Sequence, residues 1–190
     1  DRGDGLFPEH VFTCPFVRGA TRTFRHNLVL VALDNSIKRF GILTVIEPRF
    51  YEYEDGSQKR PDLTVFGLDK TVVTDLVISC DADTALAHKV DKHGAAALTR
   101  GHQFIPISMG IWGEIHPSVF KFLCAVFDHL PNSTRKLAIL QTMRTMSEAW
   151  LIGSMAMLRG TLNHADRGQI FDVYSDSRRL HLLEQTAGGF

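Results

Sequence analysis

Residues 60–66 (RPDLTVF) and 72–78 (VVTDLVI) predict the centre of the fold. Each is a run of β-branched and apolar residues, typical of a buried strand, and each contains one aspartate, Asp62 or Asp75. A carboxylate in such a run is costly to bury unless a cation or a hydrogen-bond donor receives it. If the two strands pair through the turn at 67–70, Asp62 and Asp75 lie side by side at one end of the sheet. Two hard oxygen ligands there suit Mg²⁺ or Mn²⁺.

The composition is that of an ordinary globular domain. The chain has 190 residues, of which 44% are hydrophobic and 22% charged, so neither disorder nor membrane insertion is indicated. No apolar run reaches the roughly 18 residues needed to cross a bilayer. The first residues have neither an initiator Met nor a signal-peptide charge region, and we interpret the chain as a piece of a longer protein. Three widely spaced cysteines favour a reducing compartment, the cytosol or the nucleus.

The formal net charge is zero with His neutral, so any affinity for nucleic acid must come from local patches. Basic residues gather around the first predicted helix, while acidic residues gather at 52–55. The basic residues are Arg18, Arg22, Arg25, Lys38 and Arg39.

Hydrophobic periodicity predicts an α/β fold with the element order αβββαβ and extra C-terminal helices. We expect helices at 23–38, 84–98, 116–130 and from 133 to about 159, and strands at 40–46, at the two aspartate-bearing runs and at 103–109. Asp83 or Thr84 is the predicted cap of the second helix, Pro106 breaks the last strand, and Gly153 weakens the last helix. We expect one folded domain at 22–162, a linker remnant at 1–21 and a loosely held tail at 163–190.

A basic segment follows the second aspartate. Residues 89–93 read KVDKH, whereas the position two residues after Asp75 is Val77. The order of elements and acids resembles the PD-(D/E)xK nuclease superfamily, in which a lysine usually stands at that position of the strand. The displaced lysine resembles a narrower family, the restriction-endonuclease-like domain of site-specific non-LTR (LINE-type) retrotransposon polyproteins. In that family the lysine belongs to a Lys-x-x-Lys-Tyr motif on the following helix, and here His93 replaces the Tyr.

Three further features agree with this resemblance: Arg25-His26-Asn27 on the first helix, Glu47-Pro48 before the Arg-Pro-Asp motif, and the strand and turn from 104 to 113. The resemblance implies a restriction-endonuclease-like αβββαβ core with a mixed central sheet flanked by helices. It also implies a metal-dependent DNA endonuclease that nicks target DNA, so that the exposed 3′ hydroxyl primes reverse transcription. The expected partners are target DNA and the upstream reverse transcriptase and DNA-binding parts of the same polyprotein, in the nucleus and without a membrane.

The resemblance implies a role for each acidic residue. Asp62 and Asp75, with the backbone carbonyl of Leu76, would hold one or two Mg²⁺ or Mn²⁺ ions, and Glu47 is a candidate third carboxylate. The alternative interpretation is that each aspartate caps a turn or meets an arginine.

Lys89 and Lys92 are the candidate catalytic lysines. We expect Leu86, Val90, His93 and Ala97 to form the buried stripe of their helix, which places Lys89 nearer to the active site and Lys92 nearer to DNA phosphates. The alternative is that both are solvated.

Arg22, Arg25, His26 and Lys92 are the candidate DNA contacts. The alternative for Arg25 and His26 is a core-facing histidine beside a surface arginine. His10 and Cys14 resemble the end of a zinc knuckle, but a structural zinc site needs four ligands, so we expect no zinc in this fragment.

Two other functions explain fewer of these sequence features. One is a catalytically inactive nuclease-fold module that binds DNA or the adjacent reverse transcriptase. The other is an unrelated metallo-phosphoesterase, which the lack of a Gly-rich phosphate loop and of a His-rich metal motif disfavours.

Overall fold

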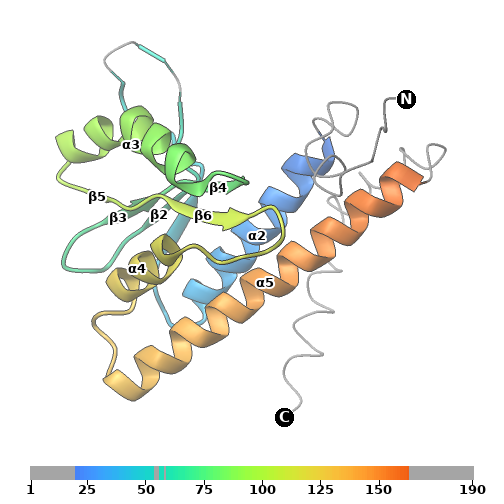
Figure 1. Cartoon of the computed structure of the whole chain (residues 1–190). Helices are drawn as coiled ribbons and strands as arrows, with labels where there is room; N and C mark the ends of the chain where they lie inside the picture. The colour runs from blue at the N-terminus through green and yellow to red at the C-terminus, as the bar shows by residue number, and fades with distance from the viewer. Residues whose placement is uncertain (1–19, 54–55, 58, 163–190) are drawn as a thin grey trace.

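The computed structural model describes residues 20–53, 56, 57 and 59–162 (Figure 1). The expectations for residues 1–19, including His10, Cys14 and Arg18, and for the tail at 163–190 lie outside the described residues, as does the side chain of Arg22.

Six short strands form the centre of the described structure. A four-stranded sheet has the order β1-β2-β3-β5, antiparallel between its first three strands and parallel between β3 and β5. A second, parallel pair joins β4 to β6. Backbone hydrogen bonds from Ile105 to Val73 and from Ile107 to Asp75 link the two ladders into one layer. The strands are β1 Thr44–Ile46, β2 Leu63–Val65, β3 Val72–Thr74, β4 Leu76–Ser79, β5 Gln103–Phe104 and β6 Ile107–Gly110.

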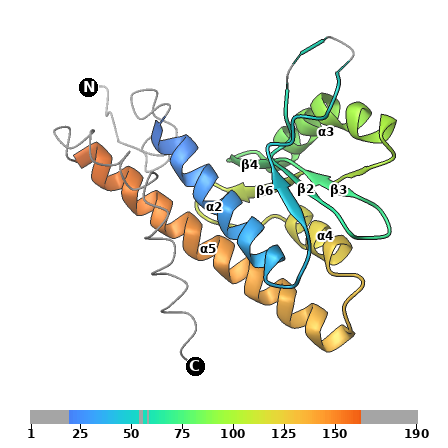
Figure 2. The same ribbon diagram turned by 180° about the vertical axis from the view of Figure 1, so that it is seen from behind.

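Four helices in the described residues cover this layer. They are α2 Ala20–Lys38, α3 Ala82–Thr99, α4 Pro117–Val126 and α5 Asn132–Leu162. Figures 1 and 2 show α2 and α5 side by side along one side of the strands, with α3 on the other side. The prediction of a mixed α/β fold in the order αβββαβ, followed by helices, is therefore confirmed, except that two strands are each split in two.

The core divides between the two faces of the sheet. A large apolar cluster fills the side of α2, α4 and α5, where Leu63, Val65, Ile107 and Phe122 are fully buried. A small cluster around Tyr51, Val73 and Ala97 lies toward α3. The sheet is thus covered on both faces.

One local prediction is wrong. The N-cap of α3 is Asp81, whose extended backbone lets its side chain accept a hydrogen bond from the Thr84 N–H at 3.2 Å. The cap therefore lies upstream of Asp83 and Thr84. The last helix, α5, runs through Gly153 without a break, and the predicted weakness at this glycine stays a prediction.

Gly153 allows the close approach of α2. A Cβ atom at this position would lie 2.8 Å from the Cα of Arg25, closer than van der Waals contact. The Arg25 side chain is buried, lies over the Trp150 ring at 5.7 Å and donates from Nη1 to Ser154 Oγ at 3.4 Å. These contacts fix α2 against α5.

We predict that Gly153→Ala destabilises the domain by about 1–3 kcal/mol, the usual cost of overpacking, although alanine favours a helix by about 1 kcal/mol. The matched control is Gly94→Ala in α3, where the new Cβ would meet Val90 Cγ1 at 3.6 Å, an ordinary contact. The control should raise the melting temperature and Gly153→Ala should lower it. Equal effects of the two changes in thermal melts would contradict the close packing at Gly153.

Candidate metal centre

Asp62 and Asp75 meet at the end of the paired strands β2 and β3. The register pairs Leu63 with Thr74, and one step further along the antiparallel ladder places Asp62 opposite Asp75. The side chains are 17% and 3% exposed. The predicted side-by-side placement of the two carboxylates is therefore present, in a poorly solvated position.

Asp75 contacts two basic side chains of α3. Lys89 Nζ donates to Asp75 Oδ1 at 2.9 Å, and His93 Nε2, one turn later, lies 2.6 Å from Asp75 Oδ2. The Tyr53 hydroxyl hydrogen-bonds His93 Nδ1 from the loop before β2. Burial alone would raise the pKa of Asp75, but the contacts with His93 and Asp62 and the charge of Lys89 hold this pKa well below its usual range.

Asp62 is held from the opposite side by α2 and by the backbone. The Leu76 N–H donates to Asp62 Oδ2 at 2.7 Å, and His26 Nε2 lies 3.1 Å from the same oxygen. Burial and contact with the Asp75 carboxylate raise the pKa of Asp62, although His26 opposes this. The pair thus keeps its negative charge on Asp75 and takes up a proton more readily at Asp62.

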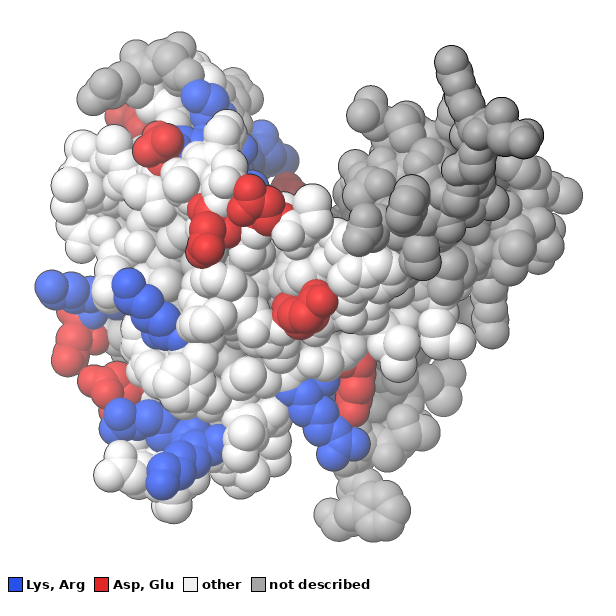
Figure 3. Space-filling view, in the orientation of Figure 1, with Lys and Arg blue, Asp and Glu red and all other residues white. Residues whose placement is uncertain are grey.

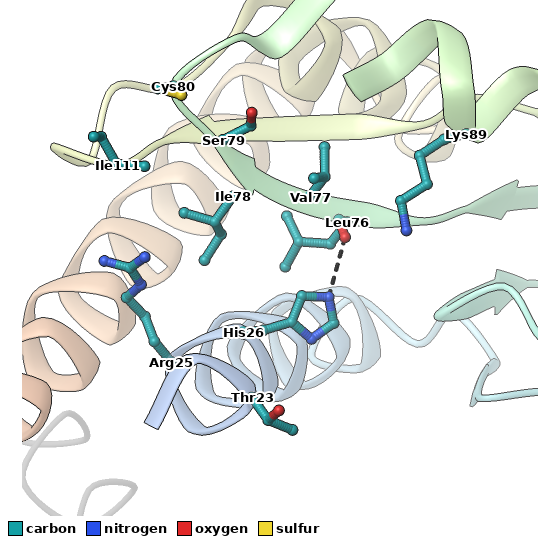
Figure 4. Close-up of a pocket in the computed structure, with 10 residues that line it drawn as sticks. All are labelled: Thr23, Arg25, His26, Leu76, Val77, Ile78, Ser79, Cys80, Lys89 and Ile111. Carbon is teal, nitrogen blue, oxygen red and sulfur yellow. Dashed lines mark hydrogen bonds between the residues drawn. The ribbon is translucent and has the colours of Figure 1, made fainter. Parts of the chain in front are cut away.

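The environment of His26 favours its protonated form. Nε2 lies 3.1 Å from the Leu76 carbonyl oxygen (Figure 4) and 3.1 Å from Asp62 Oδ2, and Nδ1 lies 3.2 Å from Asn27 Oδ1. Only an imidazolium can donate from both nitrogens to oxygen acceptors. Burial lowers the pKa of His26, but these hydrogen bonds and the charge of Asp62 outweigh it and raise the pKa to about 9.

The donor set fits a small hard cation that keeps several waters. His26 already places a positive charge between Asp62 and the Leu76 carbonyl, two of the predicted ligands. Asp75 Oδ2 is buried and, because His93 Nε2 lies out of line, has no well-aligned hydrogen bond among the described residues. No group of three or more His, Cys, Asp and Glu side chains suited to a metal occurs in the described part of the chain. Two carboxylates and one carbonyl are nevertheless a usual protein share for Mg²⁺.

Glu47 adjoins this site through its backbone. Its N–H donates to the Asp62 carbonyl at 2.9 Å, and its φ of 46° is left-handed, which is rare outside glycine. The side chain is exposed, and its predicted role as a third carboxylate stays a prediction.

A cleft of about 500 Å³ opens beside the carboxylates, between α2, β4 and α3. Figure 4 shows His26 and Lys89 pointing toward its Leu76 end, while Arg25 extends toward Ile78 and Ile111. The cleft therefore presents His26 and Lys89 next to a buried acidic pair.

Two further predicted site residues, Arg25 and Lys92, lie in different environments. Arg25 lines the cleft but is 3% exposed, so most of its surface packs inside the domain. Lys92 is half-buried on α3 and forms no hydrogen bond or ion pair with the other described residues. The DNA contacts predicted for both residues stay predictions.

The predicted buried stripe of α3 is wrong at Val90, which is 48% exposed. The buried residues are His93, Ala96 and Ala97, so the helix is rotated such that Lys89 and His93 together face Asp75. The i, i+4 spacing of these two residues could have identified His93 as a site residue. Nothing in the sequence pointed to Tyr53.

Comparison with known proteins supports a retrotransposon-related origin. No protein-family profile matches the chain. Over 77 residues, 40% of the chain, it is 30% identical to the Retrotransposable element SLACS 132 kDa protein of Trypanosoma brucei gambiense. The matched region spans only 6% of that protein's length.

Among the helices that the structure describes, none has the length and apolar character needed to cross a membrane.

We predict that the metal-free domain loses stability as the pH rises through 9. A histidine pKa that is 6.5 when unfolded and about 9 when folded stabilises the fold fully below pH 6.5, and this contribution disappears above pH 9. Because the ring is partly exposed and Asp62 is itself perturbed, we expect about 1–2 kcal/mol. Thermal melts with a chelator from pH 6 to 10 measure this.

The control for this pH dependence is His26→Asn, which cannot be protonated. Its melting temperature should be lower than that of the wild type at pH 6.5 and should approach it at pH 10. Parallel pH profiles for the two proteins would show that His26 carries no proton in the folded state.

Proposed function

We propose that this chain contains the metal-dependent DNA endonuclease domain of a LINE-type non-LTR retrotransposon, with a restriction-endonuclease-like αβββαβ core. The observation that carries the proposal is the pairing of Asp62 and Asp75 at the strand ends, with Lys89 of the following helix on the same carboxylate. The similarity to the SLACS protein supports the retrotransposon setting.

The chemistry needs a water nucleophile, neutralisation of charge on the phosphate and protection of the departing 3′ oxygen. Asp62, Asp75 and the Leu76 carbonyl would hold Mg²⁺ or Mn²⁺, which when bound polarises the phosphate and lowers the pKa of a bound water. The Leu76 N–H and His26 hold Asp62 in a fixed orientation. The Asp62 carboxylate is therefore oriented before any ion binds, which would reduce the reorganisation needed on binding.

Lys89 has the position of a charge-neutralising and water-orienting group. Its ammonium is held 2.9 Å from Asp75 Oδ1, and its side chain is 21% exposed toward the cleft. A compact ammonium can stabilise charge that develops on a phosphate oxygen more than charge in the ground state. Lys89 on α3 thus supplies the cation that Val77 cannot supply from β4.

The proposal implies target DNA as the substrate, nicked to expose a 3′ hydroxyl that primes reverse transcription. It also implies the upstream reverse transcriptase and DNA-binding segments of the same polyprotein as partners, and the nucleus as the location.

We predict that Asp62→Asn and Asp75→Asn each reduce Mg²⁺-dependent nicking of supercoiled plasmid by more than about 100-fold, beyond the 10–100-fold cost of losing an outer-shell partner. Asp69→Asn, in the exposed turn between β2 and β3, is the matched control and should nick like the wild type. If either site variant nicks at the wild-type rate, its aspartate is not a ligand of a catalytic metal and the proposed metal centre is wrong. Nicking by no variant, the wild type included, would favour the inactive DNA-binding module.

The same two variants should differ in metal-free stability at pH 7. The pKa of Asp62 is raised, so replacing its carboxylate should leave the melting temperature equal or higher. The pKa of Asp75 is lowered by its contacts, so Asp75→Asn should lower the melting temperature by several degrees. The opposite order would mean that the negative charge resides on Asp62.

We predict that Lys89→Ala lowers the nicking rate at saturating DNA by about 10²–10³-fold, the usual cost of one charge-stabilising group. Lys92→Ala should change that rate little and should instead weaken binding and reduce its salt dependence by up to about one unit of slope. Single-turnover rates and binding isotherms at several salt concentrations separate these effects. A larger rate loss for Lys92→Ala would reverse the assignment.

A further inference from the structure

The outer face of α5 exposes an unusual share of large apolar side chains. Twelve large hydrophobic residues are exposed in the described part of the chain, and five of them lie on this helix. At about 100° per residue, these five fall within an arc of about 120°. They are Leu137, Leu140, Leu151, Ile152 and Met155, and we call them, with Gln141, Arg144 and Glu148 between them, the α5 stripe.

The opposite face of α5 is fully used by the fold. Ala138, Thr142, Met146 and Met157 are buried there, and Gly153 packs on α2. The α5 stripe is therefore a second face of the same helix, with 47–66% of each of its five apolar side chains exposed. A helix with two apolar faces needs a second partner to bury the outer one.

The stripe has an internal symmetry about position 146. Leu137 and Met155 lie nine residues on either side of this position, and Leu140 and Ile152 lie six residues away. Reversing the helix end to end therefore superimposes four of the five apolar positions on apolar positions, while Leu151 falls on Gln141. This is the pattern required of an isologous contact, in which one surface packs against its own copy.

The charges on the stripe obey the same symmetry. Arg144 and Glu148 lie two residues on either side of position 146. Within the chain, Arg144 Nε donates to Glu148 Oε1 at 2.8 Å, with 82% and 56% of the side chains exposed. In an antiparallel pair of α5 helices, Arg144 of each copy faces Glu148 of the other. Two exposed pairs, each worth little alone, then join into one network of alternating charge.

We propose that the α5 stripe is a homodimer interface, in which two copies of α5 pack antiparallel about a two-fold axis at the level of residue 146. Figure 3 shows the molecule in the orientation of Figure 1, with blue and red groups scattered over a largely white surface. A second copy of the chain fits this face because it supplies both the apolar rows and the opposite charges. The interface does not depend on the nuclease proposal.

Sedimentation velocity of the 190-residue chain over a wide range of protein concentration tests the dimer. Glu148→Arg places four positive charges at the axis and Arg144→Glu places four negative charges there. Each should raise the dimer dissociation constant by about tenfold or more, since like charges facing each other across an interface cost several kcal/mol. An equimolar mixture of the two variants should recover dimers, because each Arg-bearing copy then faces a Glu-bearing copy. The double exchange, with both substitutions in one chain, should also dimerise.

Lys136→Glu is the matched control, because Lys136 is exposed on the same helix about 100° away from Leu137. It should leave the dissociation constant unchanged. A wild-type chain that stays monomeric, a dimer equally sensitive to Lys136→Glu, or a mixture that does not recover would each overturn the proposal. If a single variant shows no folding transition in a thermal melt, the dissociation constant of the double exchange is compared with that of the wild type. Loss of the dimer in the double exchange would contradict the symmetric pairing of Arg144 with Glu148.

Discussion

The described structure depends on the burial of two carboxylates where β2 and β3 end. Asp75 is 3% exposed in its side chain, and such a charge survives only with close compensating partners. Lys89 and His93 provide them from α3, and His26 provides the corresponding cation for Asp62 from α2. The two helices approach the sheet from opposite faces, so the acidic pair determines how both must be oriented.

This electrostatic arrangement also explains the asymmetry of the pair. Asp75 contacts Lys89 and His93, which hold its pKa low. Burial and the neighbouring Asp75 carboxylate raise the pKa of Asp62, although His26 opposes this. Two adjacent carboxylates repel each other when both are ionised, so their different environments move the two pKa values apart. His26 supplies a positive charge next to Asp62 and lies 3.1 Å from its Oδ2.

Much of the fold and the central pair could be predicted from local sequence. Runs of β-branched residues mark β2 to β4, and the separation of Asp62 and Asp75 across a short turn places them opposite each other once the strands pair. The rotation of α3 could not be predicted from its apolar spacing, because small alanines face the sheet beside a buried histidine while Val90 is exposed. Tyr53 lies in a loop whose position follows only from tertiary packing. Its contact with His93 has no signature in the sequence.

The packing of α2 on α5 then governs the geometry of the site from a distance. Arg25 turns toward α5, where it packs on Trp150 and against Gly153. Successive residues of a helix are about 100° apart, so fixing Arg25 in this direction makes the next residue, His26, point toward the strands. A side chain at position 153 would push α2 outward and carry His26 away from Asp62. The glycine that looks like a weakness in α5 is therefore the contact that allows the imidazolium to reach the carboxylate.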